Sequence, residues 1–358
     1  MLNLTVRKMA KIWVIGDTHF GISNNSTEWQ RIQQECFDNW LFPLWEKEVG
    51  ENDVLVHLGD VFDDRQSVNV QAMNMAIGIF ERLSEIFRGG VYILCGNHDM
   101  KNNRSNEVNS LACLKYIPRV NIITKPAVVH SLNNIRPSMA LLPYTHDDEL
   151  LNRWVSEHSG CDYIFAHAEA VGAKYIMGGS TSDRGIRYSG QAKLICGHIH
   201  LHQETSRGVL FVGTPYQLNF GDCGNDRGIL VIDGKDMKFI ENTVSPKFIR
   251  VKYSELSERE KDFAGNFVQV FVTNDEAISG GAEHTVAKLS ESAGARDIRM
   301  TPADEVGEQE VSLEVGIGES GLELERIVEE YIGSLNYDDT TKANVLKLSK
   351  HFLSSVAK

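Results

Sequence analysis

The sequence lacks the long apolar runs of a membrane protein. No stretch reaches the roughly eighteen consecutive apolar residues that a membrane-spanning helix needs, and Met1 to Ala10 lack the apolar core of a secretory signal peptide. The hydrophobic content of 42% and the charged content of 24% are ordinary for a soluble globular protein. We therefore expect a cytoplasmic protein without a membrane partner.

Cysteine pairs with metal-binding or redox spacing are also missing. The six cysteines occur without any C-x-x-C pair, which argues against a zinc ribbon or a thiol redox motif. We interpret most of them as reduced, small apolar residues of the core. No G-x-x-x-x-G-K-[ST] motif occurs either, so we expect the chain to bind no nucleotide through a P-loop.

The sequence has fewer basic residues (36 Lys and Arg) than acidic ones (49 Asp and Glu). The formal net charge is -13, whereas proteins bind the phosphate backbone of DNA largely through Lys and Arg. The excess of acidic residues is not evenly distributed along the chain, because twelve acidic but only five basic residues lie from Thr301 onward. Bound divalent cations would offset more of the negative charge locally.

A short apolar run that stops at Asp, His or Asn occurs five times along the chain. The clearest copy is the run from Val91 to Cys95, which leads into Gly96-Asn97-His98-Asp99. The other runs lead into Gly16-Asp17-Thr18-His19, Gly59-Asp60, His167-Ala168-Glu169 and Gly197-His198-Ile199-His200. Such runs suit strands buried on both faces, and ligands gather beyond the carboxyl ends of strands in open α/β sheets. We expect these polar side chains to meet at one edge.

The spacing of apolar residues predicts an α/β protein. Helical spacing occurs over residues 27–49, 68–87, 109–116 and 147–158. The first helices alternate with strands, which favours βαβ units with right-handed crossovers. Later, strand-like segments follow closely, at residues 139–142, 209–212, 229–232 and 237–240. We expect two packed sheets flanked by helices.

A chain of 358 residues is longer than one hydrophobic core usually supports, so we expect several domains. The predicted divisions are a main domain at 1–245, a small α+β domain at 246–315 and a terminal segment at 316–358. The small domain has strand-like segments at 248–253, 267–272, 297–300 and 310–315, and a helix at 282–292. The terminal segment combines a glycine-rich link with two amphipathic stripes. Its helices either fold back on their own domain as a hairpin or dock a partner.

Eight oxygen or nitrogen side chains follow the predicted strands: Asp17, His19, Asp60, Asn97, His98, His167, His198 and His200. Members of the pairs Asp17/His19 and His198/His200 are two residues apart, so each pair faces one side of an extended backbone. This many ligands suits two adjacent cations that share a carboxylate, as in phosphatases and nucleases. Imidazole, carboxylate and amide ligands without thiolate favour manganese, iron or zinc over calcium or magnesium. The sequence therefore predicts phosphoester hydrolysis. We interpret His57, inside an apolar strand, as structural.

In order along the chain, these motifs match those of calcineurin-like metallophosphoesterases: Gly16-Asp17-x-His19, Gly59-Asp60, Gly96-Asn97-His98-Asp99, His167 and Gly197-His198-x-His200. Within that superfamily the chain most resembles SbcD-type nuclease subunits (the meiotic recombination eleven family), especially those of T-even-type bacteriophages. The narrower similarities are the segment from Gly59 to Arg65, the segment Gly213-Thr214-Pro215-Tyr216, and the small domain with its helical tail.

The resemblance implies a set of roles for these residues. Asp17, His19, Asp60 and His200 would hold one ion, and Asp60, Asn97, His167 and His198 would hold the other. The expected ion is Mn²⁺, with Mg²⁺ as the alternative. An activated water would attack a DNA phosphodiester in line, and His98 would donate a proton to, or hydrogen-bond, the departing 3'-oxygen. Asp99 would either orient His98 or serve a structural turn. Many cellular relatives have histidine where this chain has Asp63, so the role of that histidine does not transfer.

The resemblance also implies partners. The substrate would be double-stranded DNA, processed by exonuclease and endonuclease activity in recombination, repair and replication, in the host cytoplasm if a phage encodes the chain. The C-terminal helices would dock a separate ATPase subunit of the structural-maintenance-of-chromosomes (SMC, SbcC) type. A homodimer through residues 68–87 and 109–116 would complete a heterotetramer, and the small domain would cap the site and bind DNA. Candidate contacts to the DNA backbone are Arg65, Lys101, Arg104, Lys174, Arg184 and Arg187.

Two other functions use the same residues. A stand-alone phosphoesterase acting on small phosphoesters or phosphoproteins would need the same ions but no DNA preference. A non-catalytic scaffold would be expected to have lost ligands, and all eight are present in the sequence.

Overall fold

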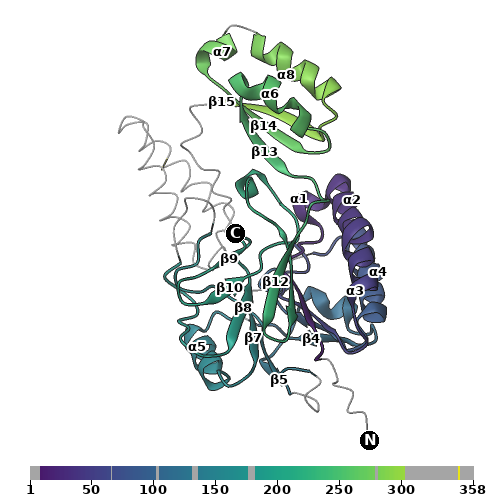
Figure 1. Cartoon of the computed structure of the whole chain (residues 1–358), viewed down its shortest axis with the longest axis vertical. Coiled ribbons are helices and arrows are strands. Elements are labelled where there is room, and N and C mark those ends of the chain that lie inside the picture. Colours follow the sequence, from purple (N-terminus) through teal and green to yellow (C-terminus); the bar gives the residue numbers. More distant parts are fainter. Residues whose placement is uncertain are drawn as a thin grey trace, which may run out of the picture. The chain divides into compact units, whose positions relative to one another are not determined.

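The computed structural model describes residues 9–65, 67–101, 105–130, 136–175, 182–278, 281–302 and 346. The chain forms two compact units, Met1–Asp304 and Glu305–Lys358. The elements below belong to the first unit (Figure 1). The predicted strand at 310–315, the glycine-rich link and, apart from Leu346, the two tail helices lie outside the described residues. In the part of the chain that is described, no helix is both long and apolar enough to cross a membrane.

The first sheet joins distant parts of the chain. Its spatial order is β12 (Asp236–Glu241), β11 (Gly228–Asp233), β1 (Ile12–Ile15), β2 (Val54–His57), β3 (Val91–Leu94) and β4 (Val120–Ile123). Strands β1 to β4 are parallel, as βαβ units require. The chain then returns to the other side of β1, where β11 pairs antiparallel and sets Ile12 opposite Ile232.

The second sheet has a parallel centre with antiparallel edges. Its order is β5 (Ala127–Val129), β6 (Met139–Leu142), β7 (Tyr163–His167), β8 (Lys193–Gly197), β10 (Val209–Phe211) and β9 (Gln203–Glu204). Strands β6, β7, β8 and β10 run parallel, whereas β5 and β9 pair antiparallel at the edges.

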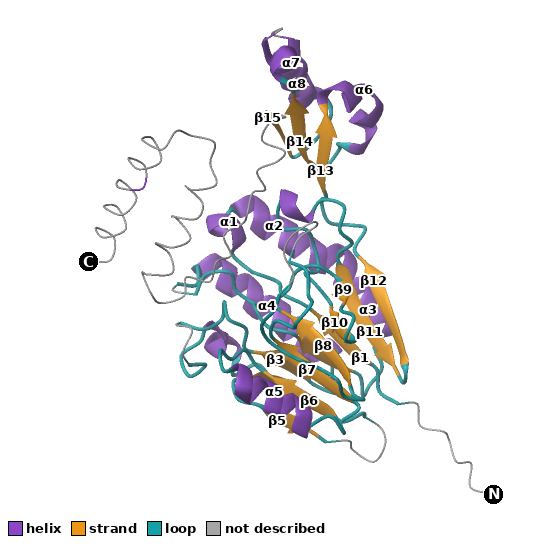
Figure 2. Cartoon of the chain, turned by 90° about the vertical axis from the view of Figure 1, so that its left-hand side faces the viewer, coloured by secondary structure: helices purple, strands orange, loops and turns teal. Residues whose placement is uncertain are grey.

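Alternate residues of each strand pack into different layers. In β1, Ile12 and Val14 belong to the core between the two sheets, together with Phe165 of β7. Trp13 and Ile15 point the other way, into the core shared with the helices. The two sheets thus lie between helices (Figure 2), which confirms the predicted fold class.

The helices largely follow the predicted ranges. The helix expected at 27–49 is confirmed as a nearly continuous run with one π-helical turn, whereas the segment at 109–116 forms a 3-10 helix instead of an α-helix. The observed elements are α1 (Ile22–Asn25), α2 (Thr27–Cys36), η1 (Phe37–Leu41), α3 (Phe42–Glu48), α4 (Val70–Ile86), η2 (Ser110–Leu114), α5 (Asp148–Glu157) and η3 (Phe220–Asp222). Strands β4 and β5 were not predicted, because they carry no fully buried residue that would mark a core face.

A small parallel sheet follows the main one in sequence. It consists of β13 (Phe248–Lys252), β14 (Phe267–Val272) and β15 (Asp297–Pro302), accompanied by η4 (Tyr253–Glu255), α6 (Leu256–Arg259), η5 (Glu260–Asp262), α7 (Asn274–Ile278) and α8 (Gly281–Ser292). It has its own apolar core, in which Val268 and Val270 of β14 pack with Val286 and Leu289 of α8.

The small sheet contacts helix α2 through an aromatic stack. The Trp29 ring lies parallel to Phe248 and Phe267, with ring centroids 6.1 and 6.0 Å away. Beside the stack, Arg296 Nη2 is 3.3 Å from Glu35 Oε2. The predicted domain boundary after residue 245 therefore falls within one compact unit, and the division into domains stays a prediction.

Candidate metal centre

The eight predicted side chains converge where strands of the two sheets end. Asp17 and His19 follow β1, Asp60 follows β2, Asn97 and His98 follow β3, His167 ends β7, and His198 and His200 follow β8. The first-sheet residues Asp17, His19, Asp60 and Asn97 are buried, as is His167. The other three side chains are partly exposed, so the cluster opens to solvent on one side.

One set of side chains surrounds the Asn97 amide oxygen. His167 Nε2 lies 2.9 Å from Asn97 Oδ1, and His198 Nδ1 lies 2.8 Å from the same atom. His167 Nε2 is also 3.3 Å from Asp60 Oδ2. The structure therefore brings together the four side chains that the family resemblance assigns to one ion.

A second set lies around His19. His19 Nε2 is 3.1 Å from His200 Nε2 and 3.9 Å from Asp60 Oδ2. Asp17, which the resemblance assigns to the ion of this second set, contacts residues of the first set: its oxygens accept the His198 backbone N–H at 3.1 and 3.2 Å, and Oδ1 is 3.5 Å from His167 Nδ1.

Asp60 is common to both sets. Ligand atoms of Asp60, His167 and His198 lie within 4.8 Å of one another, and so do those of Asp60, His19 and His98, although the resemblance assigns His98 to the leaving oxygen and not to an ion. One carboxylate shared between two groups of nitrogen and oxygen ligands is the arrangement that a pair of adjacent cations requires.

The backbone is left-handed at three of the turns into the site. His19, Asp60 and His198 have φ values of 46°, 50° and 82°. Residues with side chains seldom adopt this region and persist there where their surroundings enforce it, often at functional sites. The sheets thus hold these side chains in orientations that an isolated loop would rarely adopt.

Two glycines of the motifs make room for the ligands. A Cβ atom on Gly59 would lie 2.5 Å from His167 Nδ1, and one on Gly96 would overlap the Asp60 carboxylate. Gly59 also has a φ of 113°. Only glycine allows such close approach, so Gly59 and Gly96 serve the packing of the site as well as its turns.

The charges of the site fit a divalent cation. Burial disfavours the ionised form of Asp60, but His167 and His98 hold the pKa of Asp60 well below its ordinary value. Burial also disfavours protonated His167, yet the neighbouring Asp60 carboxylate raises the pKa of His167 to about 9. Without an ion, protonated His167 is thus the positive partner of the buried carboxylates, and a bound cation would take over this role as the imidazole loses that proton. Their oxygens, an amide oxygen and several imidazoles form a donor set that fits ions such as Mn²⁺.

The His98 ring is held by the main chain. Its Nδ1 lies 2.6 Å from the carbonyl oxygen of Asp63, and its own backbone N–H donates to Asp60 Oδ1 at 2.8 Å. Because a carbonyl only accepts, the ring proton resides on Nδ1, and Nε2 of the neutral ring is an acceptor. Burial lowers the pKa of His98.

Asp99 joins two loops of the site. Its carboxylate accepts backbone N–H groups of Gly96, Val61 and Phe62 at 2.9, 3.0 and 3.2 Å. Burial and the charge of Asp60 raise the pKa of Asp99 to about 7. These contacts match the structural turn role for Asp99, whereas the ring of His98 is held by Asp63.

His57 occupies a structural position nearby. Its Nδ1 accepts the Gly59 N–H at 3.2 Å, and its Nε2 lies 3.1 Å from Thr18 Oγ1. The ring therefore connects the loop after β1 with the loop after β2.

Three residues outside the predicted ligands also line the site. Asp63 Oδ1 lies 3.1 Å from His19 Nδ1, the Tyr144 ring packs against His167 and His198, and Glu169 Oε1 lies 3.8 Å from His198 Nε2. Glu169 follows His167 by two residues, so the alternation of a strand could have indicated it. Tyr144 has no comparable sequence signal, because the course of its loop sets its position.

The predicted DNA contacts differ in their closeness to the cluster. The charge of Arg65 contributes to the lowered pKa of His98, so Arg65 lies near the site. Burial raises the pKa of Tyr144 to about 12, and the charge of Arg184 lessens this rise, so Arg184 also lies near the site. The side chains of Lys101, Lys174 and Arg187 are exposed. Arg104 lies outside the described residues.

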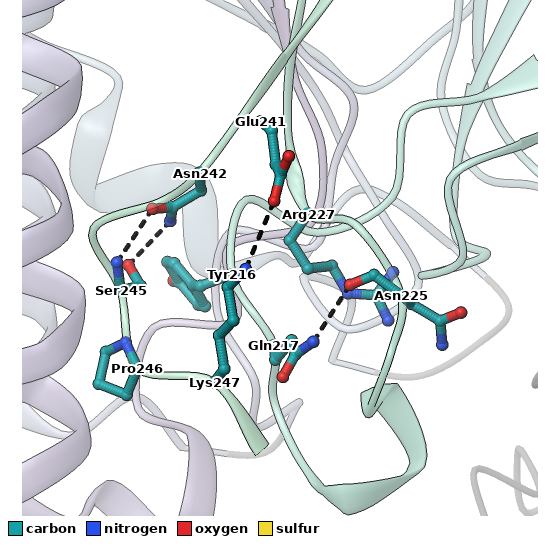
Figure 3. Close-up of a pocket in the computed structure, with 9 residues that line it drawn as sticks. All are labelled: Tyr216, Gln217, Asn225, Arg227, Glu241, Asn242, Ser245, Pro246 and Lys247. Carbon is teal, nitrogen blue, oxygen red and sulfur yellow. Dashed lines mark hydrogen bonds and ion pairs between the residues drawn. The ribbon is translucent and has the colours of Figure 1, made fainter. Parts of the chain in front are cut away.

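Arg227 supports the loop that carries His200. Its guanidinium donates to the His200 carbonyl and pairs with the Asp222 carboxylate. It lines a small pocket beside Gln217, whose side chain donates to the Asn225 carbonyl (Figure 3). Gln217 also accepts the backbone N–H of Phe248, the first residue of β13, at 2.7 Å. Hydrogen bonds thus link the start of the small sheet to the region of Arg227.

Comparisons with known proteins agree with this geometry. The chain is similar to the predicted phosphoesterases 244L of Invertebrate iridescent virus 6 (28% identity; 69% of this chain, 87% of the relative) and 078R of Invertebrate iridescent virus 3 (26%; 72% and 73%). It is also similar to exonuclease subunit 1 of Enterobacteria phage T4, at 25% identity over 91% of this chain and 93% of the relative. The family model for calcineurin-like phosphoesterases matches residues 10–202, more than half of the chain. The chain therefore belongs to the calcineurin-like phosphoesterase family.

Proposed function

We propose that this protein is a metal-dependent DNA phosphodiesterase, the nuclease subunit of a DNA-processing complex. The observation that carries the proposal is the buried Asp60 carboxylate, shared by two groups of ligands. Two bound divalent ions, with Mn²⁺ expected and Mg²⁺ as the alternative, would supply charge for phosphoryl transfer and lower the pKa of a water. DNA as substrate is supported by the similarity to an exonuclease subunit along most of both chains.

The residues of the site would form two sets of metal ligands and one proton donor. Asp60, Asn97, His167 and His198 would hold one ion, and His19, His200, Asp60 and Asp17 the other. His98 would face the departing 3'-oxygen. Because Asp63 fixes one ring proton on Nδ1, any proton given to that oxygen must come from Nε2 of the protonated ring. Neutral His98 can only accept a hydrogen bond at Nε2.

The proposal includes partners. Helix α4 and the segment around η2 expose apolar side chains, namely Val70, Val108 and Tyr116, with exposed fractions of 66%, 62% and 87%. A homodimer through residues 68–87 and 109–116, as the resemblance implies, would cover apolar side chains of this kind. An ATPase subunit of the structural-maintenance-of-chromosomes type would dock on the C-terminal helices and supply basic surface that the acidic chain lacks.

The decisive test compares linear double-stranded DNA with p-nitrophenyl phosphate as substrates in the presence of Mn²⁺. The proteins are wild type, Asp60→Asn and Asp38→Asn, each with and without the ATPase subunit. Asp38 is an exposed carboxylate of η1, so its variant has the same charge change away from the site. We expect wild type and Asp38→Asn to degrade DNA, and Asp60→Asn to lose at least about 100-fold of the rate.

The alternatives give different results in the same assay. Hydrolysis of the small ester while DNA stays intact in every combination would replace the nuclease proposal by a stand-alone phosphoesterase. Failure on both substrates, without Mn²⁺ binding, would favour the scaffold.

A further inference from the structure

Asp63 is a carboxylate beside the cluster that the ligand sets do not include. It follows β2 and precedes α4. Its Oδ1 lies 3.1 Å from Nδ1 of His19, with exposed side-chain fractions of 31% for Asp63 and 1% for His19. The carboxylate therefore meets a buried imidazole on the side of the ring that faces away from Asp60 and His200.

The main chain of the same residue meets a second imidazole. The Asp63 carbonyl oxygen is 2.6 Å from His98 Nδ1. The His19 and His98 rings are in edge-to-face contact, with centroids 4.9 Å apart, and both belong to one ligand group with Asp60. One residue thus has an oxygen close to the outer nitrogen of both histidines in that group, 3.1 Å away at His19 and 2.6 Å away at His98.

The backbone of Asp63 is anchored independently of its side chain. Its N–H donates to the Phe20 carbonyl at 3.1 Å, and the Phe20 N–H donates to the Val61 carbonyl at 2.8 Å. Phe20 and Phe62 form a parallel bridge between the two loops. Replacement of the Asp63 side chain should therefore leave its carbonyl, and the contact to His98, in place.

A carboxylate at Nδ1 determines what Nε2 can do. Neutral imidazole carries one proton, and a carboxylate oxygen 3.1 Å from Nδ1 favours the tautomer with the proton on Nδ1. The lone pair of Nε2 then faces His200 Nε2 and Asp60 Oδ2, at 3.1 and 3.9 Å. A ligating histidine whose other nitrogen donates to a carboxylate is a better oriented and more basic ligand.

From this geometry we infer that Asp63 is a positioning residue, whose side chain fixes the tautomer and orientation of His19 for one of the two ions. The inference deepens the proposed function and rests on it, since it needs an ion at this site. It predicts that loss of the Asp63 carboxylate weakens the binding of one ion and leaves the binding of the other unchanged.

The test is Mn²⁺ binding by isothermal titration calorimetry with the full chain. Wild type should bind two ions. Asp63→Ala should lower the affinity for one ion about 10- to 100-fold. Asp63→Asn, which keeps an oxygen acceptor, should lower that affinity less. The second ion should bind as in wild type. Asp64→Asn, with the same charge change at the exposed neighbouring carboxylate, should leave both affinities unchanged.

A double-mutant cycle with His19→Ala separates positioning from a general structural effect. If Asp63 acts through His19, Asp63→Asn should weaken Mn²⁺ binding only while His19 is present. Nitrogen-15 NMR of the metal-free protein should show His19 protonated on Nδ1 in wild type and a mixture of tautomers in Asp63→Ala. If thermal unfolding shows that Asp63→Ala is not folded, the comparison is made between wild type and Asp63→Asn.

The outcomes separate the two claims. Two bound ions in wild type with unchanged affinities in both Asp63 variants would overturn the role of Asp63 and leave the proposed function standing. No Mn²⁺ binding by wild type would overturn the proposed function, and the inference with it.

Discussion

His57 and His167 are both buried, yet their pKa values move in opposite directions. Burial lowers the pKa of His57 to about 3, since neighbouring charges do not offset the loss of solvation. His167 is equally buried, but the carboxylates of Asp60 and Asp17 raise the pKa of His167 to about 9. The two rings differ in their partners: His167 Nε2 lies 3.3 Å from the Asp60 carboxylate, whereas the ring nitrogens of His57 contact the Gly59 N–H and the Thr18 hydroxyl.

His57 should make the protein sensitive to acid. Its folded pKa lies below the unfolded value, so its contribution to stability is complete above about pH 6.5 and is lost as the pH falls towards 3. Through this residue the free energy of unfolding should drop by about 2 kcal/mol between pH 7 and pH 5. In His57→Gln that share of the drop should disappear. Urea unfolding with a chelator present measures it, and exposed His284→Gln is the control. Equal pH dependence in both variants would refute the expectation.

His98 should matter most when the leaving group needs a proton. We expect His98→Ala to lower kcat on DNA by about 10²- to 10⁴-fold. The p-nitrophenyl ester of thymidine 5'-phosphate should lose much less, because nitrophenolate departs without protonation. Steady-state kinetics on both substrates make the comparison. Equal losses would indicate that His98 acts by holding an ion, as its position within one ligand group also permits.

At the scale of the elements, replacement of two glycines by alanine should change the stability in opposite directions. Gly78 lies in the interior of α4, and a Cβ placed there meets no atom of the described structure within 4 Å. Gly78→Ala should therefore stabilise the protein by about 0.5 to 1 kcal/mol, because glycine is the poorer helix former. Urea unfolding tests this, and a loss of stability would mean that this face of α4 is packed against another surface.

Gly96→Ala should instead damage the site. The added methyl group would overlap the Asp60 carboxylate and backbone, so one of the two loops has to move. We expect a loss of about 1 to 3 kcal/mol in stability together with much weaker Mn²⁺ binding. Thermal unfolding and calorimetry measure the two effects. Unchanged Mn²⁺ binding would show that Asp60 can shift without consequence.

The elements that carry ligands were predictable because each has a strong local signal. Strands β1, β2, β3, β7 and β8 are fully or almost fully buried, so their apolar runs, apart from His57 in β2, are uninterrupted up to the polar residues that follow. Asp17 and His198 could be identified from such a run alone. The contact between them joins residues 181 positions apart, and no local pattern contains it.

The orientation of side chains in loops was beyond the sequence. Asp63 could be noted as a difference from relatives, but its contact with His19 depends on how the loop after β2 pairs with Phe20. Tyr144 reaches the site through the loop after β6. The left-handed backbone of Asp60 and His198 was equally hidden, because the sheets enforce what the residue type disfavours.

For the whole molecule, bound ions should contribute to stability. The site gathers buried carboxylates within a chain of net charge -13, so divalent cations relieve repulsion in the folded state. With free Mn²⁺ at about 100 times its dissociation constant, the gain is about 2.7 kcal/mol for one ion. Wild type should therefore melt at a higher temperature with Mn²⁺ than with a chelator, and Asp60→Asn should show little difference. Equal shifts in both proteins would place the stabilising ions elsewhere.

Strand β1 has one neighbour that follows soon in the chain and another that arrives late. While the chain is being synthesised, β2 can pair with β1 early, but the opposite edge of β1 has to wait for β11, where Ile12 meets Ile232. At about 5 to 20 residues per second, that wait is roughly 10 to 40 seconds. An unpaired, apolar edge recruits other strands. On the ribosome this edge should therefore be a site where chaperones bind, and moving the hairpin β11–β12 ahead of β1 by circular permutation should shorten the time for which the edge is exposed.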